Sequence, residues 1–247
     1  MPWEILRVGR VSSTQDAARA HAESGAEVGT VIVADTQSEG RGRQGRSWDS
    51  PPGGLYMTAL LAAGSHANLM PLVAGVAVAE VMRDGYGVEA MLKWPNDVLI
   101  GGRKVGGVLV DADWSGDERG VILLGVGVNL NNAIPEHLEE ATSLSEEAGE
   151  EIGVDSFIES LLERLAGILP TLEDDPGEAL ARWERISETL GRRIVVKDSS
   201  GNILEGVAES IDDDGALLLD CGGRSVRVLS GTVLGAKVKS KMDPASL

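Results

Sequence analysis

The residues best suited to chemistry stand in two segments of the chain. The first, called the Arg loop below (residues 40–47), reads Gly40-Arg41-Gly42-Arg43-Gln44-Gly45-Arg46-Ser47. A guanidinium offers a planar fork of donors that matches phosphate or carboxylate oxygens, and glycine lets backbone N–H groups approach the same anion. The chain carries a formal net charge of −17, so three clustered arginines have no solubility role. The Arg loop therefore predicts an anion-binding site.

Two common phosphate-binding patterns overlap the Arg loop. Its glycines fit G-x-G-x-x-G, and residues 40–47 also fit a Walker A sequence with Arg in place of Lys. Both patterns need a helix directly after the glycines, because the helix N-terminus binds the phosphate. The chain instead continues Trp48-Asp49-Ser50-Pro51-Pro52-Gly53-Gly54, which cannot start a regular helix at once. Neither pattern is favoured, and the plain alternative is an exposed turn with solubilising arginines.

The second segment weakens that plain alternative. It reads Lys93-Trp94-Pro95-Asn96-Asp97 and, after an apolar run, Gly101-Gly102-Arg103-Lys104-Val105-Gly106-Gly107. Residues 98–100 and 108–110 have the pattern of two strands joined by a Gly-Gly turn. Such a hairpin puts Lys104 one strand away from Asp97, and the two following glycines clear space for a ligand. The segment has the parts needed to hold a metal-bound triphosphate.

Taken together, these segments resemble the biotin protein ligase family, in order from about residue 10 to the C-terminal end. The family's G-R-G-R-x-G-R sequence stands at residues 40–46. Its K-W-P-N-D and R-K-x-G-G-I-L sequences stand at 93–97 and 103–109, with Val108 at the Ile position. Its S-T-N segment appears as Ser13-Thr14-Gln15, where Gln departs from the usual Asn, and its G-x-G-x-N strand end is 125–129.

The resemblance implies an ATP-dependent ligase that activates biotin to biotinyl-5′-AMP and transfers biotin to a specific lysine of a biotin carboxyl carrier protein. It implies ATP and Mg²⁺ as cofactors and biotin as substrate. The implied fold is α/β (α+β), with a mixed β-sheet catalytic domain of the class II aminoacyl-tRNA-synthetase/biotin ligase type at 1–190 and a small SH3-like β-barrel at 191–240. Only about ten residues precede Ser12-Ser13, so we expect the monofunctional type, which lacks an N-terminal DNA-binding domain.

The resemblance also assigns roles to single residues. Those expected to contact biotin are Ser13, Thr14, Gln37, Gly40, Arg41, Arg43, Trp48, Lys104, Gly106 and Gly107. Those expected to contact the nucleotide are Arg41, Arg43, Arg46, Lys93, Asn96, Asp97, Lys104 and Asn129. The expected catalytic residues are Arg43, Lys104 and Asp97, with Lys104 bridging the biotin carboxylate and the α-phosphate. Asp97 is also the candidate Mg²⁺ ligand, since this ion is usually held by one or two carboxylates plus phosphate oxygens.

Several of these residues have simpler interpretations. Ser13 has the pattern of the cap of a helix at 14–24. Asn129, at the end of a strand, is as often a turn former as a ligand. Trp94 and Trp114 are more typical of packing than of stacking on adenine. The three histidines, His21, His66 and His137, lack metal-ligand spacing and receive no role.

The remaining elements follow from hydrophobic periodicity. Strands are expected at 30–34, 55–60 and 120–129, and helices at 67–84, 157–169 and 178–190. Residues 135–150 are acidic and helix-prone. After Gly191 the pattern changes to short β segments at 194–196, 217–219 and 226–228, separated by Asp-Gly and Gly-Gly turns. That change marks the predicted domain boundary.

Composition limits the cellular setting. One cysteine, Cys221, excludes an intrachain disulfide and fits a reducing compartment. The start of the chain lacks a signal-peptide pattern, and no apolar stretch reaches the ~18 residues of a spanning helix. A pI near 4.5 argues against nucleic acid as a partner. We expect a cytoplasmic enzyme that does not bind membranes, while monomer and homodimer stay open, as does the identity of the carrier.

Two other functions fit parts of the pattern. A lipoate or octanoate transferase shares the wider fold, but it is not expected to carry the Arg loop. A non-catalytic biotin or nucleotide sensor would bind ligand without turnover. Both are distinguished from a ligase by which acid, if any, the protein activates.

Overall fold

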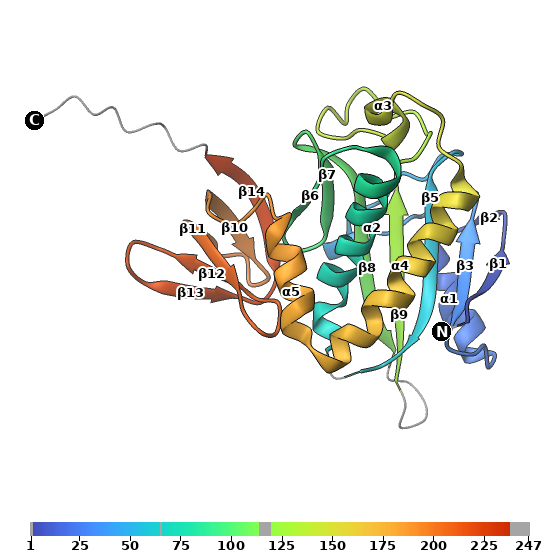
Figure 1. Cartoon of the computed structure of the whole chain (residues 1–247), viewed down its shortest axis with the longest axis horizontal. Coiled ribbons are helices and arrows are strands. Elements are labelled where there is room, and N and C mark those ends of the chain that lie inside the picture. Colours follow the sequence, from blue (N-terminus) through green and yellow to red (C-terminus); the bar gives the residue numbers. More distant parts are fainter. Residues whose placement is uncertain (1, 65, 114–119, 238–247) are drawn as a thin grey trace, which may run out of the picture.

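The computed structural model describes residues 2–64, 66–113 and 120–237 (Figure 1). Its largest element is a seven-stranded mixed sheet. In spatial order the strands are β1 (Glu4–Arg7), β3 (Thr30–Ala34), β5 (Leu55–Ala62), β9 (Val121–Val128), β8 (Arg103–Asp113), β7 (Asp97–Ile100) and β6 (Ala90–Lys93). Only β1 and β3 pair in parallel, and the other neighbours are antiparallel. The predicted α/β class is confirmed, whereas strand β1 was not predicted.

Helices cover both faces of this sheet. Helix α1 (Thr14–Glu23) packs on one face, where Ala18 meets Ile32, Leu60 and Leu123. Helices α2 (Met70–Tyr86), α4 (Val154–Asp174) and α5 (Pro176–Arg185) lie over the other face (Figure 1). A short 3-10 turn, η2 (Ala67–Leu69), leads into α2. Because α2 is buried along most of its length, it carries apolar residues on nearly every side.

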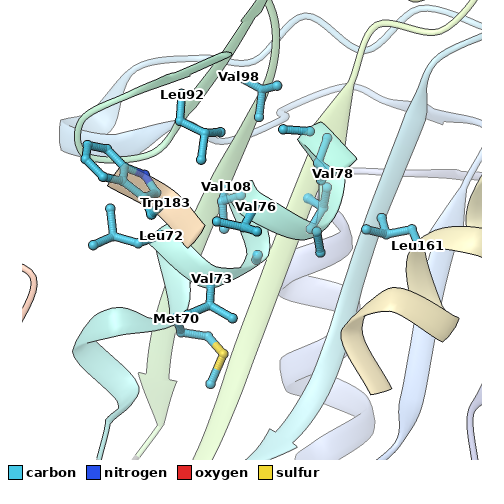
Figure 2. Close-up of a cluster of buried hydrophobic side chains, with 14 of the residues drawn as sticks. Met70, Leu72, Val73, Val76, Val78, Leu92, Val98, Val108, Leu161 and Trp183 are labelled. Carbon is cyan, nitrogen blue, oxygen red and sulfur yellow. The ribbon is translucent and has the colours of Figure 1, made fainter. Parts of the chain in front are cut away.

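Figure 2 shows the core under α2. Val76 of α2 lies beside Val108 of β8, and Trp183 of α5 lies beside Leu92. Trp183 is 2% exposed, so α5 is held by a large apolar anchor. A valine or leucine side chain of this cluster contributes about 1.5–3 kcal/mol when it is fully buried. This core fixes β6, β7 and β8, the strands that carry the second motif.

The acidic segment at 135–150 is mostly not helical, contrary to the prediction. Only α3 (Leu144–Ala148) forms there, capped by the side chain of Ser143. The preceding residues run beside β8 instead, because their backbone groups bond to the main chain of Lys104. Tertiary hydrogen bonds therefore override a local preference for helix. The helix predicted at 178–190 likewise ends at Arg185.

The C-terminal part, predicted as a small barrel, is a five-stranded antiparallel sheet. In spatial order its strands are β13 (Ser225–Val228), β12 (Leu217–Asp220), β11 (Ile203–Ile211), β10 (Arg193–Asp198) and β14 (Gly231–Lys237). Strands β11 and β14 were not predicted. Trp94, 1% exposed, donates from Nε1 to the carbonyl of Gly215 at 3.1 Å and joins this sheet to the larger one. The packing role predicted for Trp94 is confirmed, while Trp114 lies outside the described residues.

A small parallel pair, β2 (Arg10–Val11) and β4 (Thr36–Gln37), links the start of α1 to the entry of the Arg loop. Within the described residues, no helix is long and apolar enough to cross a membrane.

Candidate active site

A cavity of about 710 Å³ lies where the large sheet, the Arg loop and strand β14 meet. Its wall contains most of the residues that the sequence pointed to: Ser13, Thr14, Gln37, Arg41, Arg43, Arg46, Trp48, Lys93, Asn96, Asp97, Lys104, Gly107 and Asn129. Gly40 and Gly106 are buried beneath the wall and do not line it. Segments that are far apart in sequence thus form one site.

Lys104 enters the cavity because strand β8 contains a bulge. Val98 pairs with Gly106 and Leu99 pairs with Lys104, so Val105 is an extra residue on β8. Without the bulge, Lys104 and Gly107 would lie on opposite faces of the strand. With it they share a face, and Lys104 Cε lies 3.4 Å from the place where a Cβ on Gly107 would be.

Lys104 is paired with a carboxylate across the hairpin. Its Nζ lies 2.6 Å from Oδ1 of Asp97, and both side chains are partly exposed, at 34% and 26%. Asp97 itself pairs with Gly107 in the ladder, which places it on the same face. The hairpin proposed from the Gly101-Gly102 turn is therefore confirmed.

The Arg loop folds back on itself rather than opening into a helix. The N–H of Trp48 donates to the carbonyl of Gly40 at 2.8 Å, and the N–H of Gly42 donates to that of Arg46 at 2.7 Å. Its tip, η1 (Arg43–Gly45), places Gln44 at a φ of 58°. That left-handed conformation is uncommon for residues other than glycine. The structure agrees with the rejection of both helix-dependent patterns.

The three arginines of the loop face three different surroundings. Arg41 donates to Asp16 of α1 at 2.8 Å. Arg46 donates to the hydroxyl of Thr232 at 2.6 Å. Arg43 is half-buried and donates to Asn96 Oδ1 at 3.2 Å. Of the three, Arg43 is the guanidinium most directed toward the hairpin that carries Lys104.

Burial gives Arg43 an unusual electrostatic setting. Desolvation lowers the pKa of its guanidinium, the Asp97 carboxylate raises it, and the positive charge of Arg46 lowers it further, with a net decrease from the usual value. A partly desolvated cation interacts more strongly with an anion than one in bulk water. Arg43 is therefore suited to stabilise a transferring phosphate group.

At the other end of the cavity, polar groups hold one another in place. Gln37 accepts the N–H of Thr14 at 2.8 Å through Oε1 and donates through Nε2 to Ser50 Oγ at 2.8 Å. Thr58 donates its hydroxyl to Thr14 Oγ1 at 2.9 Å. Ser13 accepts the N–H of Gln15, so its predicted cap role is confirmed. These fixed dipoles suit a small polar group such as a cyclic urea.

Gln15, where the family usually has Asn, reaches the sheet beneath α1. Its Nε2 donates to the carbonyl of Leu109 at 3.1 Å. The absence of a side chain at Gly125 makes room, because a Cβ there would lie 2.5 Å from Gln15 Nε2. Gln15 Oε1 is buried and has no partner among the described residues.

Trp48 forms the apolar wall of the cavity. Its ring lies against Gly127, where an added Cβ would come within 2.8 Å of Trp48 Cε2. Lys104 Nζ lies 5.2 Å from the ring centroid, a cation–π distance. The glycines of β8 and β9 thus leave the space that a flat, mostly apolar ligand or the Trp48 ring can fill.

Asn129 has a structural role whatever ligand it contacts. Its Nδ2 donates to the carbonyl of Thr142 at 3.1 Å, and its Oδ1 accepts from Asn132 at 3.1 Å. It also lines the cavity. The turn-forming and ligand-binding interpretations are therefore compatible.

The described residues contain no group of three or more His, Cys, Asp or Glu side chains that could hold a metal ion. An ion such as Mg²⁺ keeps several waters and is bound through phosphates with one or two carboxylates, so a single carboxylate would be enough to contribute to its site. Asp97 is the carboxylate that pairs with Lys104, and its charge also acts on Arg43.

Part of the wall could not be found from sequence. Thr232, Val233 and Leu234 of β14 line the cavity, as does His137, to which the sequence gave no role. Nothing local in residues 231–234 indicates a site. Their contribution depends on contacts such as that of Thr232 with Arg46, between residues 186 positions apart.

Comparison with known proteins shows which family this chain resembles. The model of the biotin/lipoate A/B protein ligase family matches residues 8–129, and that of the biotin protein ligase C-terminal domain matches residues 189–234. The bifunctional ligase/repressor BirA of Bacillus subtilis is 34% identical over 234 residues, which cover 90% of this chain and 71% of the relative.

Two further relatives resemble this chain over nearly its full length. The biotin–[acetyl-CoA-carboxylase] ligase of Mycobacterium tuberculosis is 33% identical and covers 94% of this chain and 89% of its own. The solved structure of biotin protein ligase from Aquifex aeolicus in complex with biotin and ATP has a TM-score of 0.82 at 29% identity, covering 93% and 97%. The cavity, its motifs and these similarities together establish that this chain belongs to the biotin protein ligase family.

Proposed function

We propose that the protein uses ATP to activate biotin as biotinyl-5′-AMP and then transfers biotin to one lysine of a biotin carboxyl carrier protein. The observation that carries the proposal is the meeting of Arg43, Lys104 and Asp97 in one cavity, on the two segments that resemble the family's motifs. The carrier and the role of each residue are part of this proposal.

In the first step, a carboxylate oxygen of biotin attacks the α-phosphorus of ATP. The bond from the α-phosphorus to the oxygen that bridges to the β-phosphate breaks, and pyrophosphate leaves with that electron pair. Two anions approach each other, so fixed cations must offset their repulsion. We assign this to Lys104, between the carboxylate and the α-phosphate, and to Arg43, on the phosphate oxygens.

Bound Mg²⁺ would neutralise part of the triphosphate charge. The residues of this chain do the remaining work of binding and orientation. Asp97 keeps Lys104 in place through the 2.6 Å ion pair. The polar groups around Thr14 and Gln37 bind the urea end of biotin, and Trp48 covers the apolar body and excludes water from the mixed anhydride.

In the second step, the amine of the acceptor lysine attacks the carbonyl carbon of the mixed anhydride. The carbon–oxygen bond to the phosphate breaks, AMP leaves, and the amine loses a proton as the amide forms. Arg43 would stabilise the departing phosphate. No residue of the described cavity needs to become covalently attached to biotin.

The proposal is tested by incubating the protein with ATP, Mg²⁺, biotin and a recombinant biotin carboxyl carrier domain, and measuring the mass of the carrier. We expect one biotin per carrier, dependent on ATP and lost when the acceptor lysine is replaced by arginine. Parallel reactions contain lipoate or octanoate instead of biotin. Modification by those acids and not by biotin would contradict the assignment of substrate.

A further inference from the structure

The main chain of Lys104 is held on one side by a segment outside the sheet. Strand β9 pairs with β8 only from Gly106 onward, so Lys104 lies beyond the end of that ladder. Residues 140–142 take the place of β9 there. The N–H of Lys104 donates to the carbonyl of Glu140 at 2.7 Å, and the N–H of Thr142 donates to the carbonyl of Lys104 at 2.9 Å.

This matters because the pairing on the other side of Lys104 is interrupted next to it. Lys104 pairs with Leu99 of β7, and the bulge at Val105 breaks the regular ladder at the following residue. A residue between a bulge and a strand end has fewer ladder hydrogen bonds to fix its direction than one inside the sheet. The direction of the Lys104 side chain therefore depends on how firmly residues 140–142 are held.

Thr142 is the residue through which that segment is fixed. It is 0% exposed, and its carbonyl accepts from Asn129 at 3.1 Å. Its hydroxyl donates to Oε1 of Glu147 in α3 at 2.7 Å. Thr142 is thus tied to the end of β9 by its backbone and to α3 by its side chain.

Glu147 links Thr142 to Arg103, the residue before Lys104. The same Oε1 that accepts from Thr142 also accepts from Arg103 at 2.5 Å. Arg103 makes a second ion pair with Glu146, at 2.9 Å. The Glu147 side chain is 19% exposed and that of Glu146 is 52% exposed. Of these two carboxylates, only Glu147 is largely shielded from solvent and bonded to both Arg103 and Thr142. Shielded, charge-assisted hydrogen bonds are the stronger ones.

We propose that Glu147 is a positioning residue for Lys104, because its carboxylate joins Thr142, which bonds to the Lys104 main chain, to Arg103, the residue before Lys104. It does not line the cavity and needs no contact with substrate. This inference rests on the proposed function, in which Lys104 bridges the two reacting anions. A displacement of about 1 Å at such a group can cost about a hundredfold in rate.

The test is the rate of biotin-dependent exchange of labelled pyrophosphate into ATP by Glu147→Ala. We expect kcat to fall between about tenfold and a hundredfold, while KM for ATP and biotin changes much less, because misplacement affects the transition state most. Glu146→Ala is the matched control. It removes the other ion pair of Arg103 and leaves Thr142 in place, so its rate should stay near that of the wild type.

A double variant separates a role through Lys104 from a general structural effect. In the background of Lys104→Ala, adding Glu147→Ala should cause no further loss, since residues that act as a unit are not additive. Multiplicative losses would overturn the proposal, as would equal effects of Glu146→Ala and Glu147→Ala. Should Glu147→Ala not fold, Thr142→Val removes the same hydrogen bond, and Thr142→Ser should restore the rate.

Failure of this inference differs from failure of the proposed function. Wild-type exchange with biotin together with an unaffected Glu147→Ala rejects the positioning role alone. Absence of exchange in the wild-type protein rejects the ligase assignment on which it rests.

Discussion

At the scale of single residues, the three arginines of the Arg loop are alike in sequence and different in surroundings. Arg43 is half-buried and bonded to Asn96 at the hairpin, whereas Arg41 is bonded to Asp16 on the surface of α1. Sequence alone assigned both to the ligands, because spacing cannot show which acid faces which guanidinium. The surroundings of the two side chains thus give a physical reason for the distinction that the resemblance makes, in which Arg43 is an expected catalytic residue and Arg41 is not.

This difference predicts that truncating Arg43 and truncating Arg41 to alanine lower the reaction rate by unequal amounts. Arg43→Ala should lower the rate of biotin-dependent pyrophosphate exchange by about 10²–10³, the usual cost of removing one preorganised donor to a developing charge. Arg41→Ala removes an exposed ion pair worth about 0.2–1 kcal/mol, so its loss should stay below about tenfold. Steady-state exchange rates at saturating ATP measure both. Losses of equal size would contradict the separate roles.

At the scale of elements, the turns and strands encoded by a few neighbouring residues could be predicted from sequence. Structure that depends on contacts between residues far apart in sequence could not. The Gly101-Gly102 turn and the buried strand at residues 30–34 are encoded within a few residues, and both are confirmed. Residues 135–150 have a helix-prone composition, yet only α3 forms there. Glu140 and Thr142 instead form backbone hydrogen bonds with Lys104 of β8. Contacts of β14 with the Arg loop escape sequence reasoning for the same reason.

The closure of the Arg loop gives a prediction at this scale. A Cβ on Gly40 would lie 2.3 Å from the backbone oxygen of Trp48, so Gly40→Ala must open the loop. We expect faster trypsin cleavage near Arg43, and weaker protection by biotin plus ATP than in the wild type. Gly42→Ala is the control, because its nearest neighbour, an oxygen of Arg46, lies 3.3 Å away.

The wild type provides the reference for that experiment. We predict that biotin plus ATP suppresses its cleavage near Arg43, because the glycine-rich loop should become ordered over the ligands. Equal cleavage with and without ligands would contradict ordering of the loop. Equal cleavage of the Gly40 and Gly42 variants would contradict the closure geometry.

At the scale of the whole molecule, the C-terminal sheet takes part in the site. Thr232 meets Arg46, and Gly215 accepts from Trp94 of the second motif. We propose that residues 1–190 and 191–240 are separate domains, and these contacts lie between them. The second domain is therefore expected to influence catalysis as well as stability.

The turn at residues 212–216, which carries Gly215, predicts a pH dependence. Partial burial raises the pKa of Asp212, but hydrogen bonds donated by the Arg227 side chain and by the backbone N–H groups of Asp214 and Ala216 outweigh it, so the pKa lies below its usual value. A lowered folded-state pKa adds stability above the unfolded pKa of about 3.9, and this stability is lost as pH falls through the folded value.

Asp212→Asn should therefore lower the free energy of unfolding by about 0.5 kcal/mol at pH 7, a modest figure because solvent screens the interactions of a partly exposed group. The difference from wild type should shrink below about pH 4. Denaturant unfolding at several pH values measures it, with the exposed neighbour Asp213→Asn as control. A difference that grows in acid would contradict the assignment.

The central claim is that Lys104 brings the biotin carboxylate and the α-phosphate of ATP together in this cavity. Its most direct test is exchange of labelled pyrophosphate into ATP with Mg²⁺, supplied in turn with biotin, lipoate or octanoate, for the wild type and Lys104→Ala. We expect exchange with biotin alone, reduced by about 10²–10³ in the variant. Biotin binding without exchange in the wild type, or an unchanged rate in Lys104→Ala, would contradict the account.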